Sequence, residues 1–92
     1  MLVIEDDEWV CRLLVNAIRD AGYGVLACAT AKEGFETACA EEPSAIVCDV
    51  ELPDGDGFWV ARSIRSEASP VAATPFIFLT GLDDPASRME GF

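Results

Sequence analysis

The stretch AIVCDVELPDGDG, residues 45–57, decides the fold of this 92-residue chain. Its first four residues are apolar without interruption, as is typical of a strand buried on both faces of a sheet. Asp49 ends that run, and the acids, Pro53 and the glycines up to Gly57 predict a tight loop. We therefore expect a central strand whose carboxyl end opens into an acidic loop.

Similar apolar runs on either side of this stretch predict three more strands, at residues 2–4, 24–29 and 75–79. Between the first two runs the pattern becomes helical. Asp7 is a suitable helix cap, and apolar residues follow it at helical spacing at Val10, Leu13, Leu14, Ala17, Ile18 and Ala21.

Further helices are expected between the remaining strands. One covers about residues 31–41, capped by Thr30 and facing inward through Gly34, Phe35, Ala38 and Cys39. The next is marked by Phe58, Ala61, Ile64 and Arg65, and it closes before residue 70. A fourth is expected to begin near Ala86, because Pro85 suits a first helical turn.

Strands that alternate with helices predict an α/β fold with a parallel sheet covered on both faces. Right-handed crossovers and the short chain favour a doubly wound, flavodoxin-like sheet. In such sheets ligands bind at the carboxyl ends of the strands. The functional residues are therefore expected where the strands end.

Composition excludes several classes of function. With 17 acidic and 6 basic residues the net charge is −11, so direct nucleic-acid binding is not expected. The chain has no histidine, which excludes catalysis by an imidazole of its own. Its four cysteines form no Cys-x-x-Cys pair, so we interpret them as small apolar residues of a cytoplasmic protein. No apolar run is long enough to span a membrane.

Acidic residues gather at the predicted strand ends. Glu5 and Asp6 follow the first strand, Asp49 follows the third, and Thr80 with Gly81 follows the fourth. Crowded carboxylates repel one another unless a cation neutralises them, and Mg²⁺ prefers such oxygen ligands. Taken singly, acids in such positions are more often helix caps or part of a solvated rim, and a threonine such as Thr80 often hydrogen-bonds its own loop. Together they predict a Mg²⁺ site at one edge of the sheet.

Three segments resemble the receiver domain of two-component response regulators. LVIEDD at residues 2–7 resembles the first strand and acidic pair of that family, and residues 45–57 resemble its phosphoacceptor segment, with Pro53 and Gly57 in place. TPFIFLTG at residues 74–81 resembles its fourth strand and hydroxyl residue. The motifs occur in the family's order, and the resemblance covers essentially the whole chain.

The resemblance implies a role for each site residue. Asp49 would accept a phosphoryl group from a phosphohistidine on a sensor histidine kinase or phosphotransfer protein. Mg²⁺ would be held by Glu5, Asp6, Asp49 and the backbone carbonyl of Glu51. Thr80 would contact the phosphoryl group and act as the switch, and the small Gly81 would leave access to it.

The family's domain continues through a fourth helix, a fifth strand ending in a lysine, and a fifth helix. We therefore interpret residues 1–92 as one incomplete receiver domain that ends within the expected fourth helix and lacks the fifth strand and last helix. Lys32, the only lysine, lies on the second predicted helix and cannot replace the family's lysine. The apolar strand 76–79 would then be an unprotected edge, which favours a homodimer through that edge.

Two alternatives remain open from the sequence. A pseudo-receiver would keep the acidic site but serve as a protein-interaction or dimerisation domain that does not switch. A phosphatase of the haloacid dehalogenase type would use Asp49 as nucleophile, but that class resembles Asp-x-Asp-x-Thr, whereas this chain has Glu51 and Pro53 at the matching positions. A conventional enzyme is therefore not expected.

Overall fold

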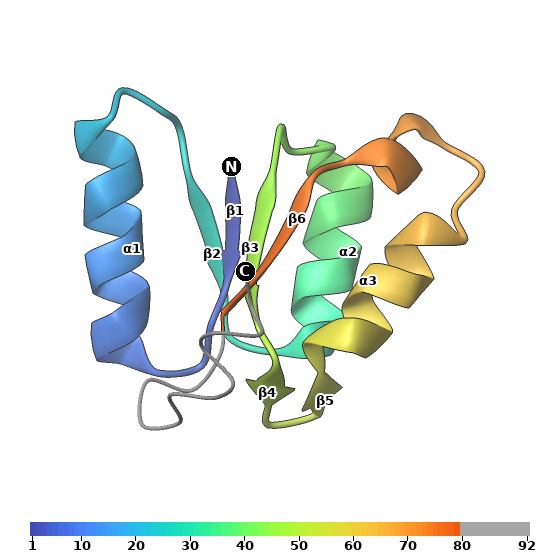
Figure 1. Cartoon of the computed structure of the whole chain (residues 1–92), viewed down its shortest axis with the longest axis horizontal. Helices are drawn as coiled ribbons and strands as arrows, with labels where there is room; N and C mark the ends of the chain where they lie inside the picture. Colours follow the sequence, from blue (N-terminus) through green and yellow to red (C-terminus); the bar gives the residue numbers. More distant parts are fainter. Residues whose placement is uncertain (80–92) are drawn as a thin grey trace.

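The computed structural model describes residues 1–79 and arranges four strands in one parallel sheet, in the order β2-β1-β3-β6 (Figure 1). Their bounds are Leu2–Ile4 for β1, Leu26–Cys28 for β2, Ile46–Asp49 for β3 and Phe76–Leu79 for β6. In the register, Val3 lies opposite both Ala27 and Val47. β1 and β3 are thus the inner strands, and the predicted doubly wound α/β fold is confirmed.

Helices cover both faces of the sheet. α1 (Glu8–Asp20) lies on one face, whereas α2 (Ala31–Glu41) and α3 (Gly57–Arg65) lie on the other (Figure 1). A short 3-10 helix, η1 (Pro70–Ala73), leads from α3 into β6. None of the helices among residues 1–79 is long and apolar enough to cross a membrane.

The starts of α1 and α2 are fixed by the predicted caps. The Asp7 carboxylate accepts hydrogen bonds from the N–H groups of Trp9 and Val10, at 2.9 and 3.0 Å. The Thr30 hydroxyl accepts one from the N–H of Glu33 at 3.1 Å. Because each cap lies within three residues of its partners, local sequence was sufficient to predict both.

The core lies between the sheet and the pair α2–α3. Its fully buried members include Leu2, Ile4, Ile46, Cys48, Val60 and Ile64. α2 approaches β1 so closely that a Cβ on Gly34 would lie 2.5 Å from Cδ1 of Ile4. Two of the cysteines, Cys28 and Cys48, are buried, as predicted for small apolar residues.

The apolar layer between α1 and the sheet buries much less than the core under α2 and α3. α1 has no buried residue, Leu13 is 50% exposed, and Ala17 and Ala21 are also exposed. Ile77 on β6 is 52% exposed. Leu13, Ala17 and Ala21, which belong to the apolar stripe of α1, are thus exposed in the described structure, where the main contacts of α1 are with β1 and β2.

Three predictions need correction. Strand β2 is shorter than the expected 24–29, and the expected loop 49–57 contains a small antiparallel hairpin of β4 (Glu51–Leu52) and β5 (Gly55–Asp56). α3 faces inward through Gly57, Val60 and Ile64, so Phe58 is half exposed. The helix begins one residue before Phe58 because Asp56 caps it, which sets the buried face. The helix expected near Ala86 lies outside the described residues.

Candidate functional site

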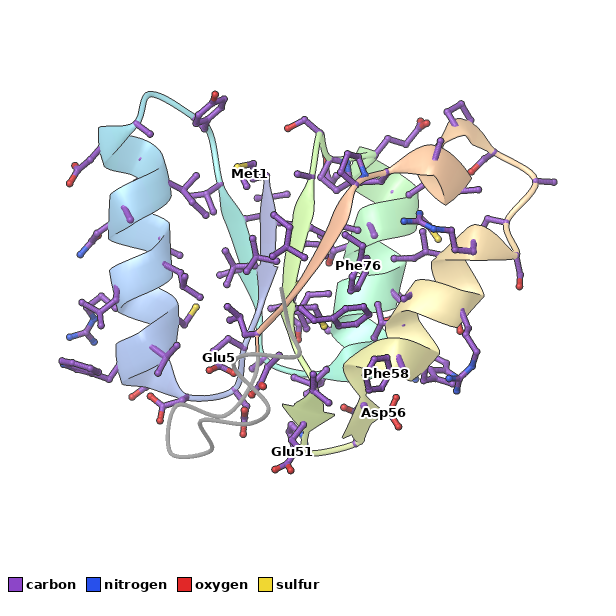
Figure 2. All side chains as sticks on the ribbon, in the orientation of Figure 1. Met1, Glu5, Glu51, Asp56, Phe58 and Phe76 are labelled. Atoms are coloured by element: carbon purple, nitrogen blue, oxygen red, sulfur yellow. The ribbon has the colours of Figure 1, made fainter. Side chains whose placement is uncertain are left out.

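Three acidic side chains meet at the carboxyl edge of the sheet. Glu5 and Asp6 directly follow β1, and Asp49 is the last residue of β3. Since Ile4 pairs with Cys48, the two strand ends lie side by side. Carboxylate oxygens of Glu5, Asp6 and Asp49 lie within 4.8 Å of one another. The structure therefore brings together the predicted side-chain ligands, and Figure 2 shows Glu5 and Glu51 at this edge.

The three carboxyl groups differ in their exposure. Glu5 is only 7% exposed, Asp49 is half-buried, and Asp6 is open to solvent. The backbone N–H of Asp6 donates a hydrogen bond to Oε2 of Glu5 at 3.1 Å. Glu5 is thus the buried member of the cluster, and Asp6 is the member that solvent or a ligand reaches first.

Burial raises the pKa of Glu5 to about 8, and a hydrogen bond with Asp49 and the negative charges of Asp49 and Asp6 act in the same direction. Without a cation, the environment of Glu5 therefore favours its protonated form. A divalent cation would favour the ionised form of all three groups, because it replaces repulsion by attraction. Carboxylate oxygens are hard ligands of the kind Mg²⁺ prefers, so Glu5, Asp6 and Asp49 fit this ion.

The backbone around Asp49 is tightly packed. A Cβ on Gly57 would lie 2.5 Å from the carbonyl oxygen of Asp49 and 3.1 Å from Sγ of Cys48. That Sγ donates a hydrogen bond to the same carbonyl at 3.2 Å, and burial raises the pKa of Cys48 to about 12, so its thiol stays protonated. Gly57 therefore allows the start of α3 to approach β3, which the sequence indicated only as a tight loop.

The hairpin β4–β5 lies beside this cluster. The N–H of Glu51 donates to Oδ1 of Asp49 at 3.4 Å, and Pro53 occupies the exposed turn. Leu52 anchors the hairpin in the core. The structure thus places the main chain of Glu51, the fourth expected ligand, against the carboxylate of Asp49.

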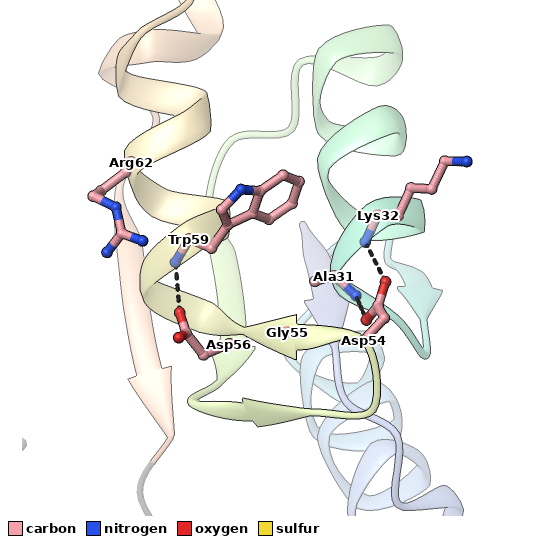
Figure 3. Close-up of a pocket in the computed structure, with 7 residues that line it drawn as sticks. All are labelled: Ala31, Lys32, Asp54, Gly55, Asp56, Trp59 and Arg62. Carbon is pink, nitrogen blue, oxygen red and sulfur yellow. Dashed lines mark hydrogen bonds between the residues drawn. The ribbon is translucent and has the colours of Figure 1, made fainter.

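Two hollows flank the site. One of about 420 Å³ extends from Glu5 and Asp6 between α1 and β2, where Arg12 also lines it. The other, of about 620 Å³, lies between the first turns of α2 and α3 and the hairpin (Figure 3). The first hollow gives a ligand access to the acidic cluster from the α1 side.

Sequence reasoning missed the role of Asp54. Its carboxylate accepts hydrogen bonds from the N–H groups of Ala31 and Lys32, at 2.7 and 3.0 Å (Figure 3). No local signal could have identified these partners, which lie more than 20 residues away in the sequence. Thr80 and Gly81 lie outside the described residues, and their proposed roles remain predictions.

The fold and site together define a flavodoxin-like α/β domain with a carboxylate cluster at the carboxyl ends of adjacent strands. The whole chain, residues 1–92, matches the response regulator receiver domain family. This chain therefore belongs to the receiver domain family of response regulators, as its motifs predicted.

Similar proteins are found among both curated sequences and solved structures. The transcriptional regulatory protein GltR of Pseudomonas aeruginosa is 36% identical over 91 residues, which are 99% of this chain and 37% of that protein. The alkaline phosphatase synthesis transcriptional regulatory protein PhoP of Bacillus subtilis is 31% identical, with the same coverage. The chain thus spans little more than a third of the length of these relatives.

Solved structures agree with the fold. A putative response regulator from Chloroflexus aurantiacus has a TM-score of 0.85 and 31% identity, covering 99% of this chain and 74% of that one. The chemotaxis response regulator CheY4 of Vibrio cholerae has a TM-score of 0.82 and 27% identity, and the match covers 97% of this chain and 73% of that one.

Proposed function

We propose that Asp49 accepts a phosphoryl group from a phosphohistidine on a sensor histidine kinase or phosphotransfer protein. Mg²⁺ would be held by Glu5, Asp6, Asp49 and the backbone carbonyl of Glu51. The observation that carries this proposal is the convergence of three carboxylates within 4.8 Å at the edge where such sheets bind ligands. Membership of the receiver family supports the same assignment.

Asp49 is the best placed of the three carboxylates to act as nucleophile. It is half-buried at the end of a central strand, and the N–H of Glu51 orients its Oδ1 at 3.4 Å. An Asp49 oxygen attacks phosphorus, forming a P–O bond while the P–N bond to the donor imidazole breaks. The imidazole leaves with the electron pair of that bond and takes a proton from solvent.

The remaining residues supply position and electrostatics, on which phosphoryl transfer largely depends. Bound Mg²⁺ would neutralise the phosphoryl oxygens. Gly57 lets α3 support the backbone of Asp49, and the hollow beside Arg12 reaches the carboxylates of Glu5 and Asp6. The donor histidine belongs to the partner, which agrees with a chain that has none. We expect the domain to act in the cytoplasm, where free cysteines such as these four persist.

Intact-mass spectrometry after incubation with Mg²⁺ and acetyl phosphate tests the proposal. We expect one phosphate adduct on the native chain, and none after addition of EDTA. Asp49→Asn is the matched control, because it keeps the shape of the side chain but removes the nucleophilic carboxylate. It is expected to carry no adduct.

Absence of an adduct on a chain shown to be folded would contradict the proposal and favour the pseudo-receiver. Retention of the adduct in Asp49→Asn would show that a residue other than Asp49 accepts the phosphoryl group. The same samples should not turn over an added phosphomonoester, because Glu51 and Pro53 stand where the phosphatase motif has Asp and Thr. Turnover would favour the phosphatase alternative.

A further inference from the structure

Asp54 joins the tip of the β4–β5 hairpin to the start of α2. Its Oδ1 accepts a hydrogen bond from the N–H of Ala31 at 2.7 Å, and its Oδ2 accepts one from the N–H of Lys32 at 3.0 Å. Both carboxylate oxygens are therefore used, and Figure 3 shows the side chain directed at the helix. A charged acceptor shared by two N–H groups makes a strong contact of defined geometry.

α2 has a cap of its own and does not depend on Asp54 to begin. The Thr30 hydroxyl accepts from the N–H of Glu33, and the Thr30 carbonyl accepts from the N–H of Gly34 at 2.9 Å. Asp54 satisfies the two N–H groups that remain in the first turn. The distinctive consequence of the Asp54 contact is therefore that the hairpin is held in place.

The hairpin needs such support because it is very short. Each strand has two residues, with Glu51 opposite Asp56 and Leu52 opposite Gly55. Two-stranded hairpins are marginally stable in water even when they are longer. Leu52 fixes the base of this one in the core, whereas its turn at residues 53–54 is exposed. The contact with α2 anchors that exposed end.

The first residue of the hairpin is also the one that contacts the phosphoacceptor. Glu51 follows Asp49 by two positions, and its N–H donates to Oδ1 of that residue. A displacement of the hairpin would therefore move both the hydrogen-bond donor to Asp49 and the neighbouring Glu51 carbonyl. The path from Asp54 to Asp49 runs through the four residues 51–54 and the hydrogen bond from Glu51 to Asp49.

We propose that Asp54 is a positioning residue, which holds the hairpin against α2 so that the Glu51 main chain stays in place for Asp49 and for Mg²⁺. The part that concerns Mg²⁺ rests on the proposed function. Mutation of a residue that holds metal ligands in position without binding the metal itself typically lowers metal affinity by about 10–100-fold.

The test compares Asp54→Ala with Thr30→Ala. Both variants remove hydrogen bonds from the first turn of α2, but only Asp54→Ala frees the hairpin. Calorimetric titration with Mg²⁺ is expected to give a dissociation constant about tenfold higher for Asp54→Ala, at the low end of that range. Thr30→Ala is expected to bind as the native chain does. Asp54→Asn keeps one acceptor oxygen, so its dissociation constant for Mg²⁺ should lie between those of Asp54→Ala and Thr30→Ala.

Amide hydrogen exchange of the metal-free chain provides a second readout. We expect faster exchange at the N–H of Glu51 in Asp54→Ala but not in Thr30→Ala. Unchanged exchange and unchanged Mg²⁺ affinity in Asp54→Ala would overturn the proposal, as would equal effects of the two variants. If the native chain binds no Mg²⁺, the proposed function fails, and the exchange data alone decide whether Asp54 holds the hairpin.

Discussion

At the scale of single residues, Glu5 combines burial with an unfavourable electrostatic environment. Only 7% of it is exposed, and its pKa is raised to about 8 by burial and by the neighbouring carboxylates. Between its ordinary pKa of 4.5 and 8, the folded chain holds a proton that the unfolded chain has lost. The stability of the metal-free chain therefore falls as pH rises through this range.

The variant Glu5→Gln removes this ionisation and should abolish the associated loss of stability. We expect its melting temperature in EDTA to exceed that of the native chain by an amount that grows from pH 5 to pH 8.5. The difference has this sign because only the native chain must ionise a buried carboxyl group as the pH rises. Thermal unfolding followed by circular dichroism measures it.

Glu36→Gln, a change on the exposed side of α2, is the control for loss of one negative charge. If the melting temperatures of Glu5→Gln and the native chain depended on pH in the same way, the expectation would be contradicted. Added Mg²⁺ should reduce the difference in melting temperature between Glu5→Gln and the native chain, because the cation stabilises the ionised carboxylate that the variant lacks.

At the scale of elements, the contact between the start of α3 and the end of β3 is possible because Gly57 has no side chain. The N–H of Gly57 donates to the carbonyl of Val50 at 2.8 Å, while its Cα faces the Asp49 carbonyl. Because that neighbour is backbone, it cannot move aside as a flexible side chain would. The close packing of α3 on β3 therefore requires glycine at this position.

The variant Gly57→Ala is expected to lose about 1–3 kcal/mol of unfolding free energy, the usual cost of overpacking. Urea denaturation measures the change. Gly24→Ala is the matched control, because a Cβ there meets nothing within 4 Å. Equal stability of the two variants would show that α3 can shift without cost.

At the scale of the whole molecule, the sheet has an apolar outer strand in the described part of the chain. β6 pairs with β3 on one side only, and Ile77 is 52% exposed. Such edges pair readily with other strands unless they are covered or charged. The homodimer expected through this edge stays a prediction.

Sedimentation velocity tests it. We expect the native chain to associate at micromolar concentration and Ile77→Lys to shift the distribution toward monomer, because lysine on an edge strand opposes pairing. Leu13→Lys introduces the same charge at an equally exposed site on α1 and should leave the association unchanged. A compact monomer of the native chain throughout this concentration range would contradict the prediction.

Local patterns in the sequence determined the four strands of the parallel sheet, the helices α1 to α3 and the identity of the acidic cluster. Asp7 and Thr30 cap the helices that they were expected to cap, because both act within a few residues. Glu5, Asp6 and Asp49 could be grouped because the carboxyl ends of parallel strands meet at one edge. Periodicity and topology rules were enough for these features.

Tertiary structure alone decided the properties that depend on distant neighbours. The burial that raises the pKa of Glu5, the approach of Gly57 to the Asp49 carbonyl and the exposure of Leu13 depend on how elements pack. Asp54 finds its partners 22 and 23 residues away. A sequence pattern reports period and composition over one element, whereas these contacts form only when separate elements meet in space.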